Sequence, residues 1–456
     1  MPTRRRTGPQ PRNAERAGAR SPSAAVTALP ARGAGTTGAT VVRLNRDADE
    51  RGLAAFRSAG MRVASSADFR GEGLPADLDG ADILVFERFG LAIVDADPGR
   101  VAKALAEGVA SHSVVSHRAE RIYRALSMRE SRRRDYLLGF RAGVDALVSD
   151  LLGEDVRGRS AEAQEAPELD ETTATWGLQA TGVVASRFAG RGVKLAVLDT
   201  GIDTAHPDFL GRVTEAMSFV RGEDVMDHAG HGTHCAGTAC GPLRASGGLP
   251  RYGVAHDAQL YVGKVLDNAG FGSDRTVIAG LEWALDAGCA IISLSLGGAT
   301  AADEPFDENY ELIGRNALES RSLIIAAAGN ESDRPFSVAP VASPANCPSI
   351  FAVAAVDERL RVAGFSSGKR SRIPGGEINL SGPGVGVLSA LPLAQGGSGR
   401  LRGTSMATPH VAGIAALYAE NDSSLRGLAL WGGLLRGARY IGGDAGDVGQ
   451  GLVYAP

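Results

Sequence analysis

Residues 403–413 read Gly-Thr-Ser-Met-Ala-Thr-Pro-His-Val-Ala-Gly. This segment presents a small hydroxyl nucleophile, Ser405, where an irregular stretch turns into a helix of small residues expected over 406–416. Gly403 permits a close backbone approach before the serine. The first N–H groups of such a helix lack intrahelical partners, so they suit a developing negative charge. Taken alone, the segment also fits an ordinary buried helix with Thr404 as its N-cap.

A serine hydroxyl is a poor nucleophile at neutral pH, so the chemistry needs a base and a group that orients the base. Residues 194–198 form an apolar run typical of a buried parallel strand, and Asp199 follows at its C-terminal end, where open α/β sheets place their sites. Asp199 is the candidate orienter. His231, between two glycines at the start of a small-residue helix, is the candidate base. Asn330, after the apolar run 323–329, is the candidate donor to an oxyanion.

Each of these residues has a plainer interpretation when it is taken singly. Asp199 fits a turn, His231 fits a histidine satisfied by its neighbours, and Asn330 fits a left-handed turn position. The four stretches together, in the order Asp, His, Asn, Ser, resemble the subtilisin-like (subtilase) family of serine endopeptidases over about residues 172–456. The order of the triad along the chain is known from that family, and the spacing of the residues does not itself require it. Residues 231–238, His-Gly-Thr-His-Cys-Ala-Gly-Thr, are most similar to its proteinase K-like branch.

The resemblance implies an α/β fold with a mainly parallel, doubly wound sheet, and Asp199, His231 and Ser405 as the catalytic triad with Asn330 at the oxyanion. It also implies that a peptide substrate adds as an extended strand, whereas plain βα loops are the alternative for the flanking segments. The implied substrate-binding residues are Phe271, Gly272, Ser295, Leu296, Gly297, Ala327, Ala328 and Gly329.

The residues implied to wall the main specificity pocket are small. They leave room for a large apolar side chain before the scissile bond, with Glu331 at the rim of that pocket. Asp274 stands where many relatives place an aromatic side chain, so the preference at a more distant substrate position is not defined by the resemblance.

Length and composition bound the remaining possibilities. A chain of 456 residues is long enough for two domains or more. A formal charge of −4 without a concentrated basic face gives no electrostatic reason to expect nucleic acid as a partner. No apolar run approaches the roughly 18 residues of a membrane span. Four cysteines are too sparse for a disulfide framework, with two bridges as the alternative. The resemblance implies that Cys235 is a free thiol packed beneath the catalytic histidine.

The N-terminal segment, residues 1–38, is rich in Arg, Ala, Pro and Gly and is typical of a disordered tail, with a transit peptide as the alternative. Its basic residues Arg4, Arg5 and Arg6 are not followed by an apolar region, so no secretory signal peptide can be recognised. We therefore expect a cytoplasmic protein. Secretion by an unrecognised route is the alternative.

Residues 39–127 alternate strand and helix signals in a βαββαβ pattern. The pattern resembles the small α+β, ferredoxin-like propeptide domains that precede subtilisin-like proteases and inhibit them, so the chain's own propeptide is an expected partner. A free-standing regulatory domain is the alternative. Residues 128–171 are expected to hold an amphipathic helix and an acidic linker before the peptidase domain, 172–456, which leaves the processing site open between 126 and 172.

No cofactor is expected to be required, and calcium has weak support. Asp208 matches a calcium ligand of several relatives, but the partner loop, about 241–252, has no Asp or Asn to add the oxygen ligands that a hard cation needs. We interpret Asp208 as structural and expect no metal site.

These features together predict a serine endopeptidase that works through an acyl-enzyme, prefers large apolar residues before the scissile bond and is made as a self-processed zymogen. The alternatives are a subtilase-derived transpeptidase or macrocyclase and a non-catalytic module that binds peptides. A binding module would be expected to lack a triad residue, and none is missing. A transpeptidase would be expected to carry a capping insertion after Asp199, and the chain shows none of any size.

Overall fold

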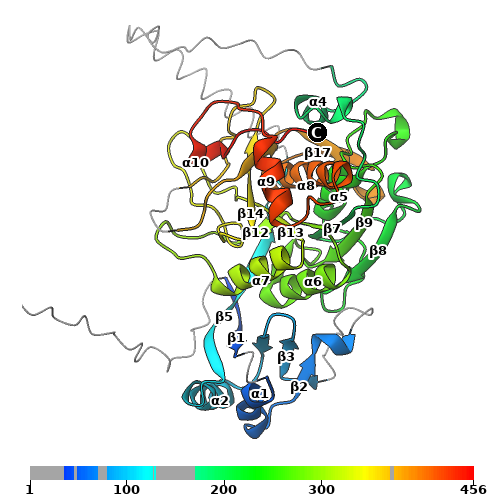
Figure 1. The fold of residues 1–456 in the computed structure, drawn as a ribbon. Coiled ribbons are helices and arrows are strands. Elements are labelled where there is room, and N and C mark those ends of the chain that lie inside the picture. Colours follow the sequence, from blue (N-terminus) through cyan, green and yellow to red (C-terminus); the bar gives the residue numbers. More distant parts are fainter. Residues whose placement is uncertain (1–34, 46–48, 70–79, 127, 130–169, 370–373) are drawn as a thin grey trace, which may run out of the picture.

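The computed structural model describes residues 35–45, 49–69, 80–126, 128–129, 170–369 and 374–456. Figure 1 shows a small N-terminal unit below a larger α/β unit. The strand β5 joins the two, because it begins in the small unit and ends inside the large one.

The large unit is built on one sheet of seven parallel strands in the order β15-β14-β13-β11-β7-β9-β8. The chain places β7 near the middle, the next two strands on one side of it and the last four on the other, which makes the sheet doubly wound. The α/β class expected from the sequence is therefore confirmed. The strands are β7 (Lys194–Asp199), β8 (Val213–Ser218), β9 (Gln259–Lys264), β11 (Ile291–Leu294), β13 (Leu323–Ala327), β14 (Phe351–Val356) and β15 (Leu380–Pro383).

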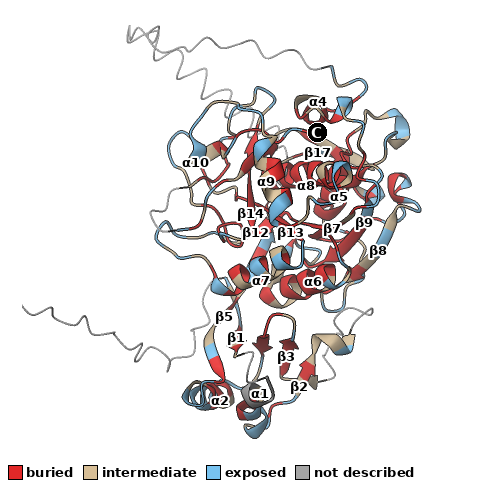
Figure 2. Ribbon diagram, viewed as in Figure 1, coloured by how far each residue is buried: buried red, intermediate tan, exposed pale blue. Residues whose placement is uncertain are grey.

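Helices cover both faces of this sheet, so its central strands are buried on both sides, whereas the edge strand β8 is partly exposed (Figure 2). Leu195 and Val197 of β7 pack in the core that contains α5 and α8, whereas Ala196 and Leu198 face the core that contains α6 and α7. This alternation is what a strand buried on both faces requires. The helices are α4 (Trp176–Ala180), α5 (His231–Cys240), α6 (Asp274–Asp286), α7 (Glu308–Glu319), α8 (Thr404–Asn421), α9 (Leu428–Arg436) and α10 (Ala445–Val448).

The small unit is a sheet in the order β5-β1-β4-β3-β2. One face packs against α1 and α2, and the other face contributes Phe86, Leu91 and Ile93 to the core beneath α6 and α7. Its elements lie where strand and helix signals were expected. They are β1 (Thr36–Leu44), α1 (Asp49–Ser58), β2 (Val63–Ser65), β3 (Ile83–Phe86), β4 (Leu91–Val94), α2 (Pro98–Ala110) and β5 (Val114–Ala125).

The end of β5 runs through the large unit as an added strand (Figure 1). It pairs antiparallel with β10 (Phe271–Ser273) on one side and with β12 (Leu296–Gly297) on the other. Residues Met128–Arg129 form the next strand, β6, which pairs with β17 (Ser398–Arg402). A third strand, β16 (Val387–Ala390), pairs with the other side of β17 and completes this sheet. The chain is therefore held on both sides of residue 127.

Several expectations concern segments at or beyond the limits of the described residues. The tail expected over 1–38 lies outside them up to residue 34, and β1 begins at Thr36, before the expected boundary. Of the segment 128–171, residues 130–169 lie outside the described part, which includes most of the expected helix and linker. Met128–Arg129, expected to lead into that helix, form the strand β6 because they pair with β17. Within the described residues, no helix has the length and apolar character needed to cross a membrane.

Candidate active site

Asp199 is the last residue of β7, at the point where the winding of the sheet reverses direction. Its side chain is fully buried, and Oδ1 accepts the backbone N–H of Thr200 at 2.7 Å. Loops at such a reversal diverge, which leaves room for a site beside the strand's carboxyl end. The carboxylate is thus held at a defined position by the centre of the sheet.

His231 is the first residue of α5 and reaches the same carboxylate. Its Nδ1 lies 2.6 Å from Asp199 Oδ1. The approach depends on Gly232, because a Cβ at that position would lie 2.2 Å from the carbonyl oxygen of Gly201. Glycine therefore lets the start of α5 pack directly on the loop after β7, and this contact brings the imidazole to the carboxylate.

The charge of Asp199 controls the protonation of His231. Burial alone lowers the pKa of this imidazole, but the adjacent carboxylate of Asp199 outweighs burial and raises the pKa well above its ordinary value. With Nδ1 directed at Asp199, the other ring nitrogen, Nε2, is the one available to accept a proton. Nε2 has no hydrogen-bond partner within the described part of the chain.

Ser405 is the second residue of α8 and is fully buried. Its hydroxyl donates to the carbonyl oxygen of Ser295 at 2.9 Å, and the Ser295 hydroxyl donates to the carbonyl oxygen of Ser405 at 2.9 Å. The structure therefore joins Asp199 to His231 but directs the serine hydroxyl elsewhere. The Ser405 hydroxyl has to leave the Ser295 carbonyl before it can pass its proton to His231.

Asn330 follows β13 and presents its amide nitrogen to a backbone carbonyl. Nδ2 donates a short hydrogen bond to the carbonyl oxygen of Leu126, the residue after β5. The amide oxygen accepts both the N–H and the hydroxyl of Thr404, each at 2.9 Å, and this assigns which end of the amide is the donor. Thr404 thus orients Asn330, a role that its sequence position next to Ser405 did not indicate.

The residues expected to bind an extended substrate surround the end of β5. Phe271 is paired with Arg124, and Gly272 with Tyr123. On the other side Leu296 and Gly297 pair with Ala125 and Arg124, and the N–H of Leu126 donates to the Ser295 carbonyl oxygen at 3.3 Å. All five residues predicted on these two segments are therefore brought to one strand of the same chain.

The side chain of Leu126 is 2% exposed and lies beside Gly297. A Cβ at Gly297 would come within 2.9 Å of Leu126 Cδ1 and 3.2 Å of Ala342 Cβ. A Cβ at Gly329 would lie 3.1 Å from the same Ala342. The missing side chain of Gly297 thus leaves the space that Leu126 occupies, and Gly329 borders the same Ala342.

Ala327 and Ala328, also predicted to bind substrate, are fully buried, and the N–H of Gly329 donates to Thr404 Oγ1 at 3.2 Å. Glu331, expected at the rim of the pocket, forms an ion pair with Arg124, whose Nη2 lies 2.7 Å from Glu331 Oε1. Glu331 therefore contacts the residue two positions before Leu126.

Two groups of side chains can be compared with metal sites. Among the described residues, ligating atoms of Asp199, His231 and Cys235 lie within 4.8 Å of one another. The Asp199 and His231 atoms are hydrogen-bonded at 2.6 Å, and burial raises the pKa of the Cys235 thiol to about 11, so these groups fit a hydrogen-bonded pair beside a protonated thiol better than a metal site. The carboxylate of Asp208 accepts the N–H of Ser246 at 2.7 Å and the hydroxyl of Tyr252, which supports its structural role.

This arrangement suits acyl transfer. A backbone carbonyl lies against the amide of Asn330, which follows β13 and is held by Thr404 at the start of α8. A hydroxyl nucleophile is the next residue of α8, and a base held by a carboxylate is nearby. These are the components needed to form a tetrahedral intermediate and to stabilise its oxyanion.

Comparison with known proteins agrees with this chemistry. The family described as "Subtilase family" matches residues 190–444. Subtilisin E from Bacillus subtilis (strain 168) is 38% identical over 279 residues, covering 60% of this chain and 68% of the relative. A subtilisin from Bacillus pumilus is 37% identical over 279 residues, covering 60% of this chain and 94% of the relative. A thermostable alkaline protease from Halalkalibacterium halodurans is 39% identical over 267 residues, covering 58% of this chain and 67% of the relative.

The cytoplasmic location expected from the sequence is wrong. The subtilisins and alkaline proteases that this chain matches are secreted, extracellular proteases, which opposes that assignment. The expectation failed because it rested only on the lack of a recognisable apolar signal region after the first arginines.

The charge coupling between Asp199 and His231 can be measured directly. In the full chain carrying Ser405→Ala, we expect the His231 ring to titrate above its ordinary pKa of about 6.5. The Asp199→Asn variant removes the main charge that opposes burial, so the pKa should fall below that value. Heteronuclear NMR of the imidazole nitrogens measures the pKa of His231 in both variants. His410, whose pKa is lowered to about 4 by burial, is the internal control. An unchanged His231 titration in Asp199→Asn would contradict the coupling.

Proposed function

This chain belongs to the subtilase family and is a serine endopeptidase, and we propose that Asp199, His231 and Ser405 are its catalytic triad, with Asn330 as a donor to the oxyanion. One observation supports the proposal above the others. The Asn330 amide donates to the carbonyl oxygen of Leu126, the position that the reacting carbonyl of a substrate would occupy.

The proposed reaction follows from the atoms of these residues. Ser405 Oγ attacks the carbonyl carbon of the peptide bond while His231 Nε2 takes the hydroxyl proton. Asp199 holds the imidazole through Nδ1 and stabilises its positive charge. The developing oxyanion accepts hydrogen bonds from Asn330 Nδ2 and from the Ser405 backbone N–H.

The intermediate then collapses to products in two stages. His231 returns its proton to the leaving amine, and an acyl-enzyme ester on Ser405 remains. Water attacks this ester with His231 again as base, which releases the acid product and restores the hydroxyl. The raised pKa of His231 means that the neutral, basic form predominates only above the ordinary titration range, so activity should increase toward alkaline pH.

We propose that a substrate binds as β5 does, between β10 and β12. Three consecutive residues of β5, 122–124, pair with β10, and Arg124 and Ala125 pair with β12. Such main-chain pairing selects extended peptides and is largely independent of sequence. The enzyme then selects its substrates by the residue that takes the place of Leu126. The space beside Gly297 suits a large apolar side chain at that position.

We propose further that residues 39–127 are a propeptide that inhibits the enzyme until it is cut. The support is the position of Leu126, whose carbonyl accepts from Asn330 and whose N–H donates to Ser295. The chain is then paired with β17 two residues later, so the bond between residues 126 and 127 is the proposed processing site. Residues 128–171 and 172–456 keep their proposed roles as linker and peptidase domain, whereas residues 36–38 of the proposed tail belong to β1.

The proteinase K-like branch remains a proposal that rests on the segment around Cys235. Its thiol lies 3.9 Å from His231 Nδ1 and 3.5 Å from the carbonyl oxygen of Ser405, so it packs beneath the proposed base and nucleophile. A transpeptidase is the second candidate, and product analysis with an added amine nucleophile separates it from a hydrolase.

Ser405→Ala should abolish self-cleavage and turnover without loss of the fold, because it removes only the nucleophilic oxygen. N-terminal sequencing of the wild-type protein is expected to show a new terminus at residue 127, or at another position before 172, that is absent from the variant. Thermal unfolding monitored by circular dichroism provides the control for the fold. Unchanged peptide hydrolysis by Ser405→Ala would eliminate the proposed triad.

Asn330→Ala should lower kcat by roughly 10²- to 10³-fold, as expected for one oxyanion donor, with a smaller effect on KM. Thr404→Val is a matched variant that leaves the amide in place but removes the hydroxyl that orients it. We expect a smaller loss of kcat in Thr404→Val. Steady-state kinetics on one fluorogenic peptide measures both, and equal kcat in wild type and Asn330→Ala would exclude this role.

A set of peptides that differ only at the position of Leu126 tests the proposed preference. Leucine, methionine and phenylalanine should give the highest kcat/KM, since the site buries an apolar side chain, and aspartate or glutamate the lowest. The bond cut is identified by mass spectrometry. Preference for an acidic residue at this position would contradict the proposal.

A further inference from the structure

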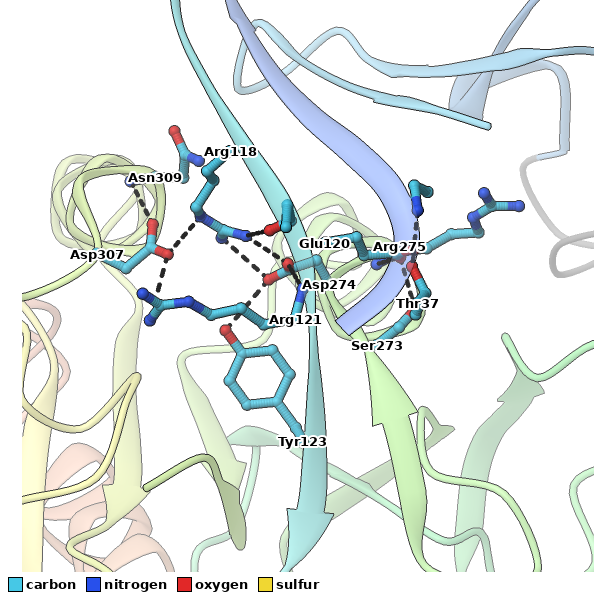
Figure 3. Close-up of polar contacts among 12 residues, drawn as sticks. Thr37, Arg118, Glu120, Arg121, Tyr123, Ser273, Asp274, Arg275, Asp307 and Asn309 are labelled. Carbon is cyan, nitrogen blue, oxygen red and sulfur yellow. Dashed lines mark hydrogen bonds and ion pairs between the residues drawn. The ribbon is translucent and has the colours of Figure 1, made fainter. Parts of the chain in front are cut away.

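A buried carboxylate at the start of α6 accepts hydrogen bonds from several groups of β5 (Figure 3). This is Asp274, which is fully buried. Arg118 Nη1 and Nη2 donate to it at 2.6 and 3.1 Å, the N–H of Arg121 at 2.6 Å and the hydroxyl of Tyr123 at 3.1 Å. The carboxylate belongs to the peptidase domain, whereas these four donors belong to the N-terminal unit.

A second carboxylate, at the start of α7, faces the same arginines (Figure 3). Asp307 Oδ1 caps the helix by accepting the N–H of Asn309 at 2.9 Å, and its Oδ2 lies 2.6 Å from Arg118 Nε and 3.8 Å from Arg121 Nη1. Arg121 Nη2 also lies 2.8 Å from Glu304 Oε1. Three acidic side chains of the large unit thus converge on two arginines of β5.

Burial makes these contacts energetically important. The side chains of Asp274 and Asp307 are 0% and 2% exposed, and that of Arg118 is 20% exposed. Burial alone lowers the pKa of Arg118, but Asp274 and Asp307 outweigh it and raise the pKa, so the guanidinium stays charged. Burial, with the charge of Asp274, raises the pKa of Tyr123, which therefore stays protonated and able to donate. Removal of one partner from such a buried pair is far more costly than removal from an exposed one.

The residues of β5 that contact the three acidic side chains lie at fixed distances along the chain from Leu126, the residue at the proposed site of cleavage. Counting backward from Leu126 as the first residue, Tyr123 is the fourth, Arg121 the sixth and Arg118 the ninth. Asp274 directly follows β10, the strand that pairs with residues 122–124. A substrate chain extended along β10 would therefore continue past Asp274, Glu304 and Asp307.

We propose that Asp274, Glu304 and Asp307 form an acidic subsite of the enzyme, which selects protein substrates with basic residues at the sixth and ninth positions before the scissile bond and a tyrosine at the fourth. The inference rests on the proposed function, because the subsite has meaning only if chains are cut at the position of Leu126. When β5 leaves, the buried carboxylates lose their donors, and a basic substrate segment restores them. While no basic segment is bound, the N-termini of α6 and α7 favour the negative charges of Asp274 and Asp307.

Matched peptides can test this subsite on the enzyme as the full chain supplies it after self-cleavage. The reference peptide copies residues 115–130, with a fluorophore and a quencher at its ends. Arg118→Gln or Arg121→Gln in the peptide should lower kcat/KM by about tenfold or more, since each removes a partner of a buried carboxylate. Arg124→Gln is the control, because Arg124 is 55% exposed in its pair with Glu331, and should cost less than about fivefold.

The same peptides assayed with an Asp274→Asn/Asp307→Asn enzyme assign the effect to the subsite. The loss caused by Arg118→Gln should shrink to less than about threefold, because the charges that recognise the arginine are gone. Tyr123→Phe in the peptide tests the hydroxyl contact with Asp274 in the same way.

Each outcome has a separate meaning. Equal kcat/KM for the reference, Arg118→Gln and Arg121→Gln peptides on the wild-type enzyme would overturn the acidic subsite and leave the proposed function intact. This comparison does not depend on the folding of any enzyme variant. Failure of the wild-type protein to cut any of the peptides would overturn the proposed function and the subsite together.

Discussion

The structure depends on burial of one parallel sheet between two layers of helices. A strand such as β7 must be apolar on both faces, so it offers nothing polar until it ends, and its last residue is Asp199. All seven strands run in the same direction, which places their carboxyl ends at one edge. Asp199, the Asn330 that follows β13 and the loop before α6 therefore converge at that edge, although they are far apart in the chain.

Close packing of small residues then sets the distances at this edge. Gly232 allows α5 to contact the loop after β7, which brings His231 to 2.6 Å from Asp199. Thr404, at the start of α8, fixes the amide of Asn330 through two hydrogen bonds. Ser405, one residue later, donates to the Ser295 carbonyl and not to His231. The proposed base and the proposed oxyanion donor are thus held in position, while the hydroxyl of the proposed nucleophile is hydrogen-bonded to Ser295.

Three kinds of contact stand out among those that attach the N-terminal unit. Its sheet buries apolar side chains such as Phe86 against α6 and α7, and β5 extends the pairing of β10 and β12. The third interaction is the buried ion network of Arg118 with Asp274 and Asp307. Hydrophobic burial and strand pairing are tolerant of sequence, whereas the ion network requires particular charges at particular positions. Specific recognition between the two units therefore resides in polar side-chain contacts, of which this network is the most buried.

The sequence by itself determined the elements and the chemistry of the site. Continuous apolar runs and helical periods of small residues located the strands and helices, since these patterns reflect burial that each segment must satisfy. The segments around Asp199, His231, Asn330 and Ser405 pointed to candidate reactive groups, because together they resemble one family of serine peptidases, and their individual roles stay proposals. The location in the cell was predicted wrongly, because the prediction rested only on the lack of a recognisable signal region. A signal of that kind serves the sorting of the protein and not its folding.

Only the tertiary structure decided which distant groups meet. The sequence marked Asp274 as a departure from its relatives, but its partners lie some 150 residues away on β5, and nothing local indicates such a pairing. The roles of Thr404 and Glu331 likewise depend on side chains brought together by packing. The orientation of Ser405 follows from a choice between hydrogen-bond acceptors that exist only in the folded chain. Local patterns record how much of a segment is buried, whereas contacts between segments depend on how the whole chain closes around its core.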